Sequence, residues 1–512
     1  MNVQSAWLKR AALFYPNDVA LIFNQRKRTF KELNDRVNRL SNGLADLGVK
    51  KGDRVAFLEG NSDYFIEIRY GLQKRGFVEV PMESRLAPNE VVYRILNCEA
   101  ETLIFNHRFE NVVKEIGPKL KTVKTFVCLE GDSEGAINYE DLIKKSSPEE
   151  PGFLVEGDDL QTIRYTSGTT GEPKAVRRTY KNNMAIAMYL MVESRITRAD
   201  RILHVLPLTH MTFLYAGPAF RMGACQVVLD KSDPETVLKT IQQEKITLIN
   251  MVPTLIYNLV NYPKVRDFDI SSVRGIHYAA SPIHPKTLRA AITLFGKIFV
   301  QYYGLTEAAG YCTILREDEH VDELHFGKSR LASCGRPNSV LVRIVKEDDS
   351  DTKPGEIGEI LLKGDTVVSG YWRNPELTKK RIVNGWLHTG DIGMVDEDGF
   401  IYVLDRKDEM IITGGFNVYP REVEEAIVSH PAVGEVGVVG IPDERWGEAV
   451  KAFIVPKQGA RVTEKEIIEH CAKNVTSYKK PKSVEFVESL PRTPTGKILR
   501  RKLREKIVGD GI

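Results

Sequence analysis

The stretch Tyr165–Lys174 (YTSGTTGEPK) carries glycines, hydroxyl side chains and a lysine in one short loop, a composition suited to binding a polyphosphate. Glycines let backbone N–H groups approach oxyanions, while the hydroxyls and the ammonium group add further donors. The loop is not an ordinary P-loop, because Pro173 stands where that motif has its second glycine and Ala175 replaces its metal-binding hydroxyl. A flexible linker is the other alternative, although the loop lies between two apolar, strand-like runs. The loop therefore predicts nucleotide chemistry.

Length and composition indicate a globular protein that acts on small ligands. A chain of 512 residues exceeds what one hydrophobic core usually serves, so we expect at least two domains. A net charge of only +3 gives no electrostatic case for a nucleic-acid partner. Six scattered cysteines without a C-x-x-C pair, and no signal peptide or apolar run of spanning length, predict a cytoplasmic protein without a transmembrane segment. The oligomeric state stays unknown.

Alternating apolar runs predict an α/β fold for the first two thirds of the chain. Helical spacing over 31–47 is followed by a glycine and then a strand-like run, and this order recurs before and after the glycine-rich loop. The expected strands are 54–58, 78–81, 102–105, 125–129, 201–207, 226–229, 248–252 and 275–279, with helices at 234–244 and 285–295. We therefore predict two α/β subdomains.

After about residue 334 the sequence changes to short β runs separated by turns. Runs at 340–345, 358–363, 390–395 and 400–404 predict an antiparallel, β-barrel-like subdomain. A further unit combines expected strands at 410–413, 435–440, 450–455 and 483–486 with helices at 421–429 and 464–474. We expect a large N-terminal domain over 1–405, a hinge at 406–409 and a small α+β lid domain over 410–512.

Five motifs occur in an order that resembles the adenylate-forming enzymes, which include acyl-CoA synthetases, firefly-type luciferases and peptide-synthetase adenylation domains. The motifs are Tyr165–Lys174, Tyr303–Glu307, His388–Asp391, Asp405-Arg406 with Gly414-Gly415, and Pro494–Lys497. The resemblance spans nearly the whole chain. It implies that a carboxylic acid is activated by ATP as acyl-AMP with release of pyrophosphate, and that the acyl group then passes to CoA. The resemblance also implies a requirement for Mg²⁺.

The resemblance assigns roles in the nucleotide site. The ATP-binding set would be Thr166, Ser167, Gly168, Thr169, Thr170, Gly171, Lys174, Ser281, Tyr302, Tyr303, Gly304, Asp391 and Arg406. The catalytic set would be Thr306, Glu307, His210 and Lys497, with Glu307 as the Mg²⁺ ligand. Because both reactants are anions, such groups would neutralise charge that grows at the α-phosphate. Taken alone, Glu307 fits a helix N-terminal acid, Asp391 a turn residue and Tyr303 a core aromatic.

Lys497 is the residue on which the resemblance depends most. It follows the turn Pro494-Thr-Gly and precedes a basic helix expected over 498–507. In the family the corresponding lysine reaches the nascent adenylate and compensates its charge. The alternative is one more lysine of a solvated basic tail, for which we leave a weak peripheral association with membranes open.

Two half-reactions in one pocket require that pyrophosphate leaves and a pantetheine arm enters. In the family, rotation of a mobile lid domain achieves this, and Asp408 occupies the hinge position. Gly414 and Gly415 would border the pantetheine tunnel, and Lys480 and Lys482 would meet the nucleotide end of CoA. A plain turn and ordinary exposed lysines are the alternatives.

The residues around His210 bear on which acid is activated. His210 resembles the family's gating residue beside the acyl carboxylate, with a core histidine as the alternative. The stretch 208–212 lacks the acidic side chain of amino-acid-activating relatives. An apolar cavity would be lined by Phe213, Tyr215, Tyr278, Ala308 and Gly310. We therefore expect a medium- or long-chain fatty acid.

Several residues depart from the family pattern and leave the specificity open: Arg164, Ala175, Arg177, Arg178 and Tyr180. Alternatives within the family are a ligase for an aryl or other small acid and a ligase that loads an acyl-carrier protein. A non-catalytic nucleotide-binding relative is the alternative from another class, and the presence of both Glu307 and Lys497 argues against it.

Overall fold

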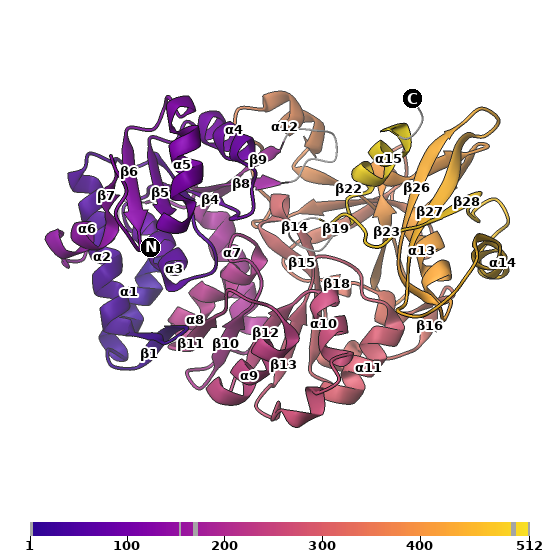
Figure 1. Ribbon diagram of the computed structural model, residues 1–512, viewed down its shortest axis with the longest axis horizontal. Coiled ribbons are helices and arrows are strands. Elements are labelled where there is room, and N and C mark those ends of the chain that lie inside the picture. Colours follow the sequence, from indigo (N-terminus) through magenta and orange to yellow (C-terminus); the bar gives the residue numbers. More distant parts are fainter. Residues whose placement is uncertain (1–3, 153–154, 167–172, 493–497, 510–512) are drawn as a thin grey trace.

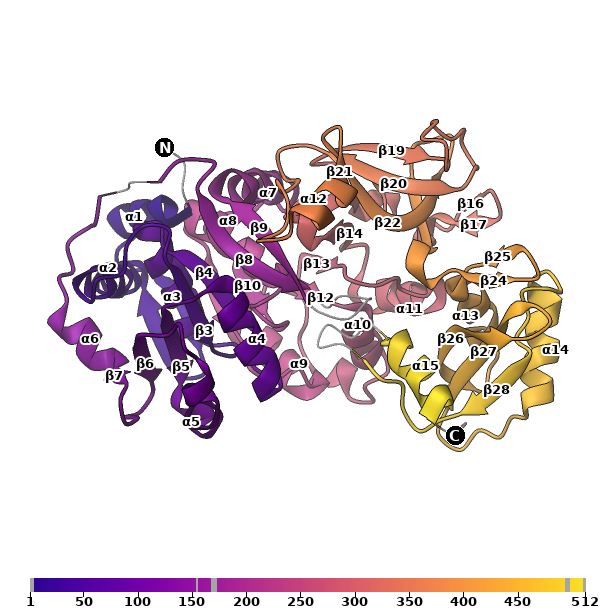
Figure 2. The same ribbon diagram turned by 90° about the horizontal axis from the view of Figure 1, so that it is seen from above.

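A computed structural model of the chain describes residues 4–152, 155–166, 173–492 and 498–509. The chain forms a large lobe and a small C-terminal lobe that lie side by side (Figure 1). Seen from above, the small lobe follows the last strands of the large lobe and ends with the C-terminal helix (Figure 2). This arrangement confirms the expected α/β fold with a large N-terminal and a small C-terminal part. Among the described residues, no helix has both the length and the apolar character needed to cross a membrane.

A nine-stranded sheet forms the centre of the large lobe, in the order β18-β15-β14-β13-β12-β10-β11-β1-β2. Its strands are β1 (Val19–Phe23), β2 (Arg26–Thr29), β10 (Arg201–His204), β11 (Cys225–Val228), β12 (Leu248–Met251), β13 (Gly275–Tyr278), β14 (Phe299–Leu305), β15 (Gly310–Leu315) and β18 (Arg336–Pro337). The six strands from β1 to β14 in this order are parallel, and the edges are antiparallel. The N-terminal strand β1 thus completes a sheet built mainly from the middle of the chain.

A seven-stranded sheet lies beside it, in the order β7-β6-β5-β3-β4-β8-β9. Its strands are β3 (Arg54–Leu58), β4 (Val78–Met82), β5 (Thr102–Asn106), β6 (Thr125–Leu129), β7 (Ile137–Asn138), β8 (Leu160–Thr166) and β9 (Lys174–Thr179). Strands β8 and β9 form an antiparallel hairpin at one edge, with Arg164 opposite Val176 and Thr162 opposite Arg178. The glycine-rich loop connects the two strands of this hairpin.

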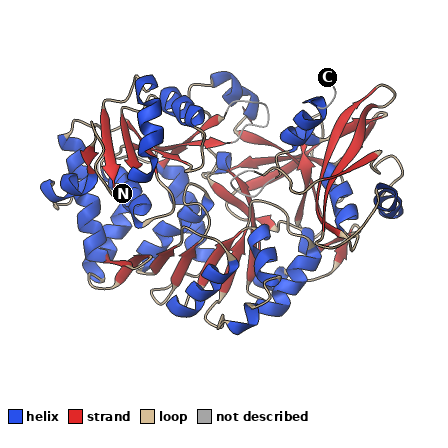
Figure 3. Ribbon diagram, in the orientation of Figure 1, coloured by secondary structure: helices blue, strands red, loops and turns tan. Residues whose placement is uncertain are grey.

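Helices pack against both sheets of the large lobe (Figure 3). They are α1 (Gln4–Phe14), α2 (Phe30–Asp46), α3 (Asp63–Lys74), α4 (Pro88–Cys98), α5 (Glu110–Ile116), α6 (Tyr139–Lys145), α7 (Tyr180–Glu193), α8 (Ala216–Met222), α9 (Pro234–Glu244), α10 (Pro253–Val260) and α11 (Pro285–Phe295). Local signals define their starts: Thr29 and Glu32 form a capping box on α2, and Asp233 caps α9 ahead of Pro234. The apolar stripe of α2 is buried, as its helical spacing predicted.

A five-stranded antiparallel sheet continues the large lobe. Its strands are β19 (Leu341–Val345), β20 (Gly358–Lys363), β21 (Ile382–Val383), β22 (Trp386–Val395) and β23 (Ile401–Arg406), and the short helix α12 (Pro375–Arg381) precedes β21. The long strand β22 pairs with β20, β21 and β23. The expected antiparallel pairing is present, and the pairings of the described strands run in an open order rather than around a closed ring. A small hairpin, β16 (Leu324–His325) and β17 (Lys328–Ser329), lies nearby.

The described part of the C-terminal lobe is a further mixed sheet with three α-helices. Its elements are β24 (Ile411–Thr413), β25 (Phe416–Val418), α13 (Pro420–Val428), β26 (Val433–Asp443), β27 (Gly447–Pro456), α14 (Glu464–Asn474), β28 (Ser483–Phe486) and α15 (Arg500–Gly509). The short 3-10 helix η8 (Lys407–Glu409) joins it to β23. Arg500 bonds to Glu424 at 2.9 Å and lies 3.5 Å from Asp405, so α15 is anchored next to the connection between the lobes.

Candidate active site

Asp391 connects two motifs that are far apart in the sequence. Its Oδ2 accepts a hydrogen bond from the Tyr303 hydroxyl at 2.6 Å, and its Oδ1 accepts one from Arg406 Nη1 at 2.8 Å. Asp391 and Arg406 are register partners on β22 and β23, while Tyr303 lies near the end of β14. Burial and the Asp391 carboxylate raise the pKa of Tyr303 well above its ordinary value, which keeps the hydroxyl a proton donor. Three residues expected around the nucleoside therefore form one hydrogen-bonded group.

Glu307 is held from a different direction. It lies in the 3-10 helix η5 (Thr306–Ala308), directly after β14. Its Oε1 accepts from the Tyr371 hydroxyl at 3.0 Å, and its backbone oxygen accepts from Val368 N at 2.9 Å. The backbone oxygen of Thr306 accepts from Nε and Nη2 of Arg178 at 3.1 and 3.0 Å. Both the segment between β20 and α12 and the β8–β9 hairpin thus fix the position of η5.

Lys174 begins β9 and faces these groups. Burial lowers its pKa, and the positive charges of Arg381 and Arg406 act in the same direction. The negative charges of Glu307 and Asp408 oppose the decrease. Electrostatic interactions therefore connect the first residue of β9 with η5, with the end of β23 and with η8. We call Lys174, Glu307, Arg381, Asp391, Arg406 and Tyr303 the nucleotide cluster.

Steric contacts explain why two positions of the motifs are glycine. A Cβ atom on Gly304 would lie 1.6 Å from the backbone oxygen of Gly310, because β14 and β15 approach closely there. Gly390 has φ +73°, and a Cβ atom on it would lie 2.8 Å from Arg381 Nη1. Any side chain at either position would displace the backbone or a cation of the site.

The nucleotide cluster fits an ATP–Mg²⁺ complex. Among the described residues, no three histidine, cysteine or acidic side chains gather into a metal site of their own. Mg²⁺ usually takes one or two carboxylates and fills its other positions with phosphate oxygens and water. Glu307 is the carboxylate of the cluster that acts on Lys174 and follows β14 directly, so it is the residue that would hold the ion, whose charge would screen the phosphates.

Some predicted residues lie outside the described part of the chain. These are Ser167, Gly168, Thr169, Thr170, Gly171 and Lys497. Their neighbours Thr166 and Lys174 are described and pair with one another across the hairpin. Asp408 lies exposed in η8, between the two lobes.

Other predicted nucleotide residues are more dispersed. Tyr302 and Tyr303 are adjacent on β14, so their side chains point to opposite faces. The Tyr302 ring is buried and stacks on Tyr311 at 4.3 Å, away from the nucleotide cluster. Ser281 is half-buried in the segment that follows β13. The backbone oxygen of His210 accepts from Arg164 Nη1 at 3.3 Å, which ties the turn before η3 (Met211–Tyr215) to β8.

The residues expected to line one acyl cavity belong to different parts of the core. Phe213 packs with Phe65 and Tyr70, and the Tyr215 hydroxyl bonds to His277 Nδ1 at 2.7 Å. Gly310 lies against Leu214, between Phe213 and Tyr215 in the sequence, while Tyr278 bonds to Gln301 and Ala308 packs under the antiparallel sheet. The strands and η3 place these side chains in several hydrophobic clusters, and the single acyl cavity stays a prediction.

The predicted CoA residues gather at the tip of the C-terminal lobe. Gly414 and Gly415 form the turn between β24 and β25, and Gly414 N donates to Trp446 O at 2.8 Å. The ammonium group of Lys482 lies 5.3 Å from the centre of the Trp446 ring. Lys480 is half-buried two residues earlier. The exposed Trp446 therefore joins the glycine turn to Lys482, a contact that the sequence analysis missed.

Three residues of the nucleotide region were also missed. Arg178 was noted only as a departure from the family pattern, and Tyr371 and Arg381 were not singled out. Arg381 ends α12 and donates to the backbone oxygen of His388 at 3.0 Å. The sequence signal for it was weak, because Lys379-Lys380-Arg381 resembles any basic end of a helix.

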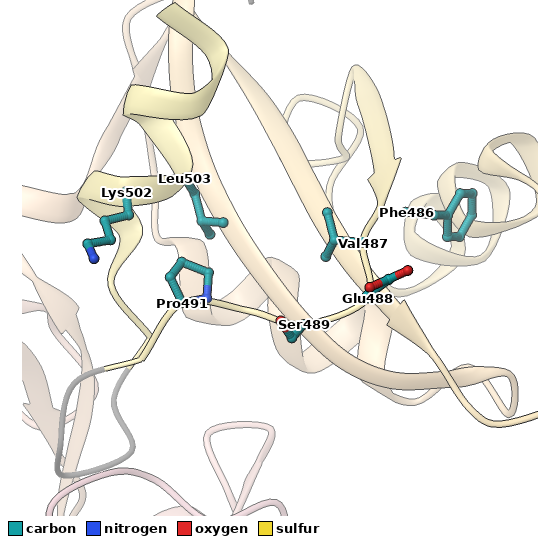
Figure 4. A pocket seen from close by; sticks show the side chains of 7 residues that line it. All are labelled: Phe486, Val487, Glu488, Ser489, Pro491, Lys502 and Leu503. Atoms are coloured by element: carbon teal, nitrogen blue, oxygen red, sulfur yellow. The ribbon is translucent and has the colours of Figure 1, made fainter. Parts of the chain in front are cut away.

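A surface depression in the C-terminal lobe is separate from this site (Figure 4). Leu503 of α15 and Val487, which follows β28, lie on its opposite sides. None of its described lining residues belongs to the nucleotide cluster or to the predicted CoA set.

Comparisons with known proteins identify the family. The model of the AMP-binding enzymes matches residues 8–372, and that of the AMP-binding enzyme C-terminal domain matches residues 422–497. A feruloyl-CoA synthase of Amycolatopsis sp is 35% identical over 505 residues, which cover 98% of each chain. A long-chain-fatty-acid–CoA ligase of Mycobacterium tuberculosis is 34% identical over 481 residues, covering 94% of this chain and 93% of that protein.

Solved structures agree with these relatives. The anthranilate CoA ligase AuaEII in complex with anthranoyl-AMP has a TM-score of 0.90 at 28% identity, covering 100% of this chain and 98% of that one. ATP-bound MatB from Rhodopseudomonas palustris has a TM-score of 0.89 at 28% identity, covering 99% of both chains. The chain belongs to the AMP-binding enzymes, and its resemblance to the adenylate-forming superfamily is confirmed.

Proposed function

We propose that the chain is an AMP-forming acid–CoA ligase. In the first half-reaction the carboxylate of an acid attacks the α-phosphorus of ATP, forms the acyl-AMP anhydride and expels pyrophosphate. In the second, the thiol of CoA attacks the acyl carbon and AMP leaves. The observation that carries this proposal is the nucleotide cluster, in which an acidic residue for the ion, cations for the phosphates and an aspartate–tyrosine–arginine group lie together.

Each member of the nucleotide cluster has a role in this proposal. Lys174 would bind the phosphates at the start of β9, and Tyr303 would pack against the base. Asp391 has two carboxylate oxygens that already accept hydrogen bonds, and it would accept from the ribose hydroxyls in the same way. Arg406 would keep Asp391 in place, because it bonds to that carboxylate from the neighbouring strand. Such prearranged donors reduce the reorganisation needed as charge grows at the α-phosphate.

Both the lysine at position 497 and the hinge belong to the proposal. Lys497 would compensate charge during adenylate formation, and η8 would be the segment at which the C-terminal lobe rotates between the half-reactions. Ion pairs at the connection between the lobes support the role of η8 as the hinge. Arg504 bonds to Glu409 at 2.9 Å and Lys407 to Glu359 at 3.2 Å, so these contacts connect η8 with both lobes.

The acid is the open part of the proposal. The expectation of a medium- or long-chain fatty acid depended on one apolar cavity, and the relatives named above act on feruloyl and long-chain acyl groups alike. CoA is the acceptor we favour over a carrier protein, because the named relatives are CoA ligases. The six cysteines are buried and free, which supports a cytoplasmic location.

A panel of carboxylic acids tests the function directly. We expect at least one acid to support AMP release that requires both ATP and CoA, measured with the purified chain. Lys497→Ala is expected to abolish pyrophosphate exchange while thioester formation from supplied acyl-AMP persists. No turnover with any aliphatic, aromatic or dicarboxylic acid would contradict the proposed ligase activity. Equal loss in both assays would contradict the role of Lys497.

A further inference from the structure

One face of the β8–β9 hairpin carries a row of cations. Lys174 and Arg178 occupy alternate positions of β9 with Val176 between them, and Arg164 lies opposite Val176 on β8. Side chains alternate along a strand, so these three share one face, whereas Ile163 and Ala175 pack in the core on the other face. Four residues of strand place Arg178 about 13 Å from Lys174. Arg164 and Arg178 therefore lie deeper than the phosphate end of the hairpin.

Arg164 is buried without enough acceptors. Arg164 is 6% exposed, and its Nη1 donates to the His210 backbone oxygen at 3.3 Å. Within the described part of the chain, its Nε and Nη2 have no hydrogen-bond partner. Nη1 of the neighbouring Arg69, which is 3% exposed, is also without one there. Counting only acceptors that the structure describes, three guanidinium nitrogens thus lack a partner in one buried region.

The surrounding carboxylates do not balance this charge. Glu79 already accepts from Arg69 and Gln73, and from Gln161 at 3.3 Å. Burial and the charges of Arg178 and Arg69 lower the pKa of Arg164 well below its ordinary value. A buried guanidinium without a counter-ion is strongly unfavourable, so a protein that retains one usually pairs it with a ligand or with ordered water.

The position of these arginines indicates where such an anion would come from. Arg164 bonds to the turn of His210, and Arg178 bonds to the backbone oxygen of Thr306. Arg69 stacks on Phe213 of η3, with 3.6 Å between the guanidinium carbon and the ring centre. The arginines therefore approach the expected acyl side of the site, while the phosphates are expected at Lys174, about 7 Å along the hairpin from the level of Arg164 and about 13 Å from that of Arg178.

We propose that Arg164, with Arg69 and Arg178 beside it, binds a second carboxylate at the far end of the acid, so that the substrates are dicarboxylic acids. The inference rests on the proposed ligase activity and specifies its substrate class. A planar guanidinium presents paired N–H donors that match the two oxygens of a carboxylate. The buried site would exclude a purely apolar acyl end, because the donors would then stay without acceptors.

The test compares acids of equal carbon number that carry one or two terminal carboxylates. We expect wild-type enzyme to prefer the dicarboxylic acid in pyrophosphate exchange. Arg164→Met is expected to lower the dicarboxylic-to-monocarboxylic ratio of kcat/KM by about 100-fold, mainly through KM. Arg164→Lys should retain part of the preference, since it keeps the charge but loses the fork. Arg266→Met, at an exposed arginine, is the matched control and should leave the ratio unchanged.

Thermal shifts give a second measurement that does not depend on turnover. The dicarboxylic acid should raise the Tm of the wild type but not of Arg164→Met. Without ligand, that variant should melt no lower than the wild type, because it loses an uncompensated buried charge.

Three results would overturn the inference. The first is a wild-type enzyme with no preference for the dicarboxylic acid. The second is an equal loss of kcat/KM for both acids in Arg164→Met. The third is an Arg164→Met variant whose dicarboxylic-to-monocarboxylic ratio of kcat/KM is unchanged and whose Tm is lower than that of the wild type. The second result would assign Arg164 to the reacting carboxylate, and the third would assign it to packing. Failure of every acid in wild-type enzyme would instead contradict the ligase proposal itself.

Discussion

The β8–β9 hairpin has cations along its whole length, yet the two ends differ in how their charge is compensated. At the end that carries Lys174, the cations face Glu307, Asp391 and Asp408. At the Arg178 end, Glu79 acts on Arg164 and pairs with Arg69, and Glu307 acts on Arg178. The first end is prepared for a ligand that brings its own cation, as ATP does with Mg²⁺. The second is prepared for a ligand that arrives as a bare anion.

The two ends of the hairpin show that the balance of positive and negative side chains, and not the number of cations alone, decides which ligand a region can bind. A region with paired ions can hold its geometry without a ligand, because each donor has an acceptor. A region with unpaired buried donors has an unfavourable free energy until an acceptor arrives, and this favours ligands that supply one. Both regions lie on the same face of the β8–β9 hairpin. One pair of strands therefore carries two kinds of binding region.

The largest expected effect comes from removing an acid at the compensated end. Glu307→Gln would remove one of the negative charges that act on Lys174 and Arg406, and it would remove the expected ligand of Mg²⁺. We expect the rate of pyrophosphate exchange to fall about 1,000-fold and to respond weakly to added Mg²⁺. Asp318→Asn, at an exposed acid in the same stretch of chain, is the control. Near-wild-type exchange by Glu307→Gln would remove the basis for calling this end an ATP–Mg²⁺ site.

A smaller effect is expected at the nucleoside side of the same end. Asp391→Asn keeps the shape but weakens the bonds from Tyr303 and Arg406. Because charged hydrogen bonds are the stronger ones, we expect kcat/KM for ATP to fall about 100-fold, mostly through KM. Steady-state kinetics at saturating acid would measure this, with the exposed Asp158→Asn as control. A change in kcat alone would mean that Asp391 acts on the chemical step rather than on binding.

The smallest effect concerns a buried charge outside both ends. Burial raises the pKa of Glu59 to about 7, from 4.5, even though Arg108 Nη2 bonds to it at 2.9 Å. The folded state therefore binds this proton more tightly than the unfolded state. Its contribution to stability is complete below the unfolded pKa of 4.5 and is lost as the pH rises through about 7.

Glu59→Gln tests this pH dependence. Between pH 4.5 and about 7, the wild-type Tm should fall by about 2 °C relative to the Tm of the variant. Thermal melts at matched ionic strength would measure this difference. Parallel melting curves for the two proteins would show that Arg108 compensates the carboxylate fully. The cost of imperfect charge balance inferred for the Arg164 region would then be weaker as well.

Sequence reasoning succeeded where the signals were local. The helices at 234–244, 285–295 and 464–474 and the strand at 54–58 have the bounds that were predicted. Caps, prolines and apolar periodicity define such elements within a few residues of chain. The order of the motifs likewise identified the family before any contact was known, since each motif is a short contiguous stretch.

Non-local contacts were not predictable in the same way. The pairing of β1 with β11 joins residues about two hundred positions apart, and periodicity contains no signal for such a partner. The residues predicted for the acyl cavity show the same limit. Types and spacing identified Phe213, Tyr215 and Tyr278 as large apolar side chains, but their directions follow from η3 and β13 within the packed core.

The sequence by itself determined the element boundaries, the motif order and the kinds of groups available for nucleotide chemistry, because these depend on neighbours along the chain. Only the tertiary structure decided that Tyr303 and Asp391, 88 residues apart, share a hydrogen bond, and that Arg164 is buried with too few acceptors. The physical reason is that burial and charge balance sum over every side chain that enters a region, from whatever part of the sequence it comes.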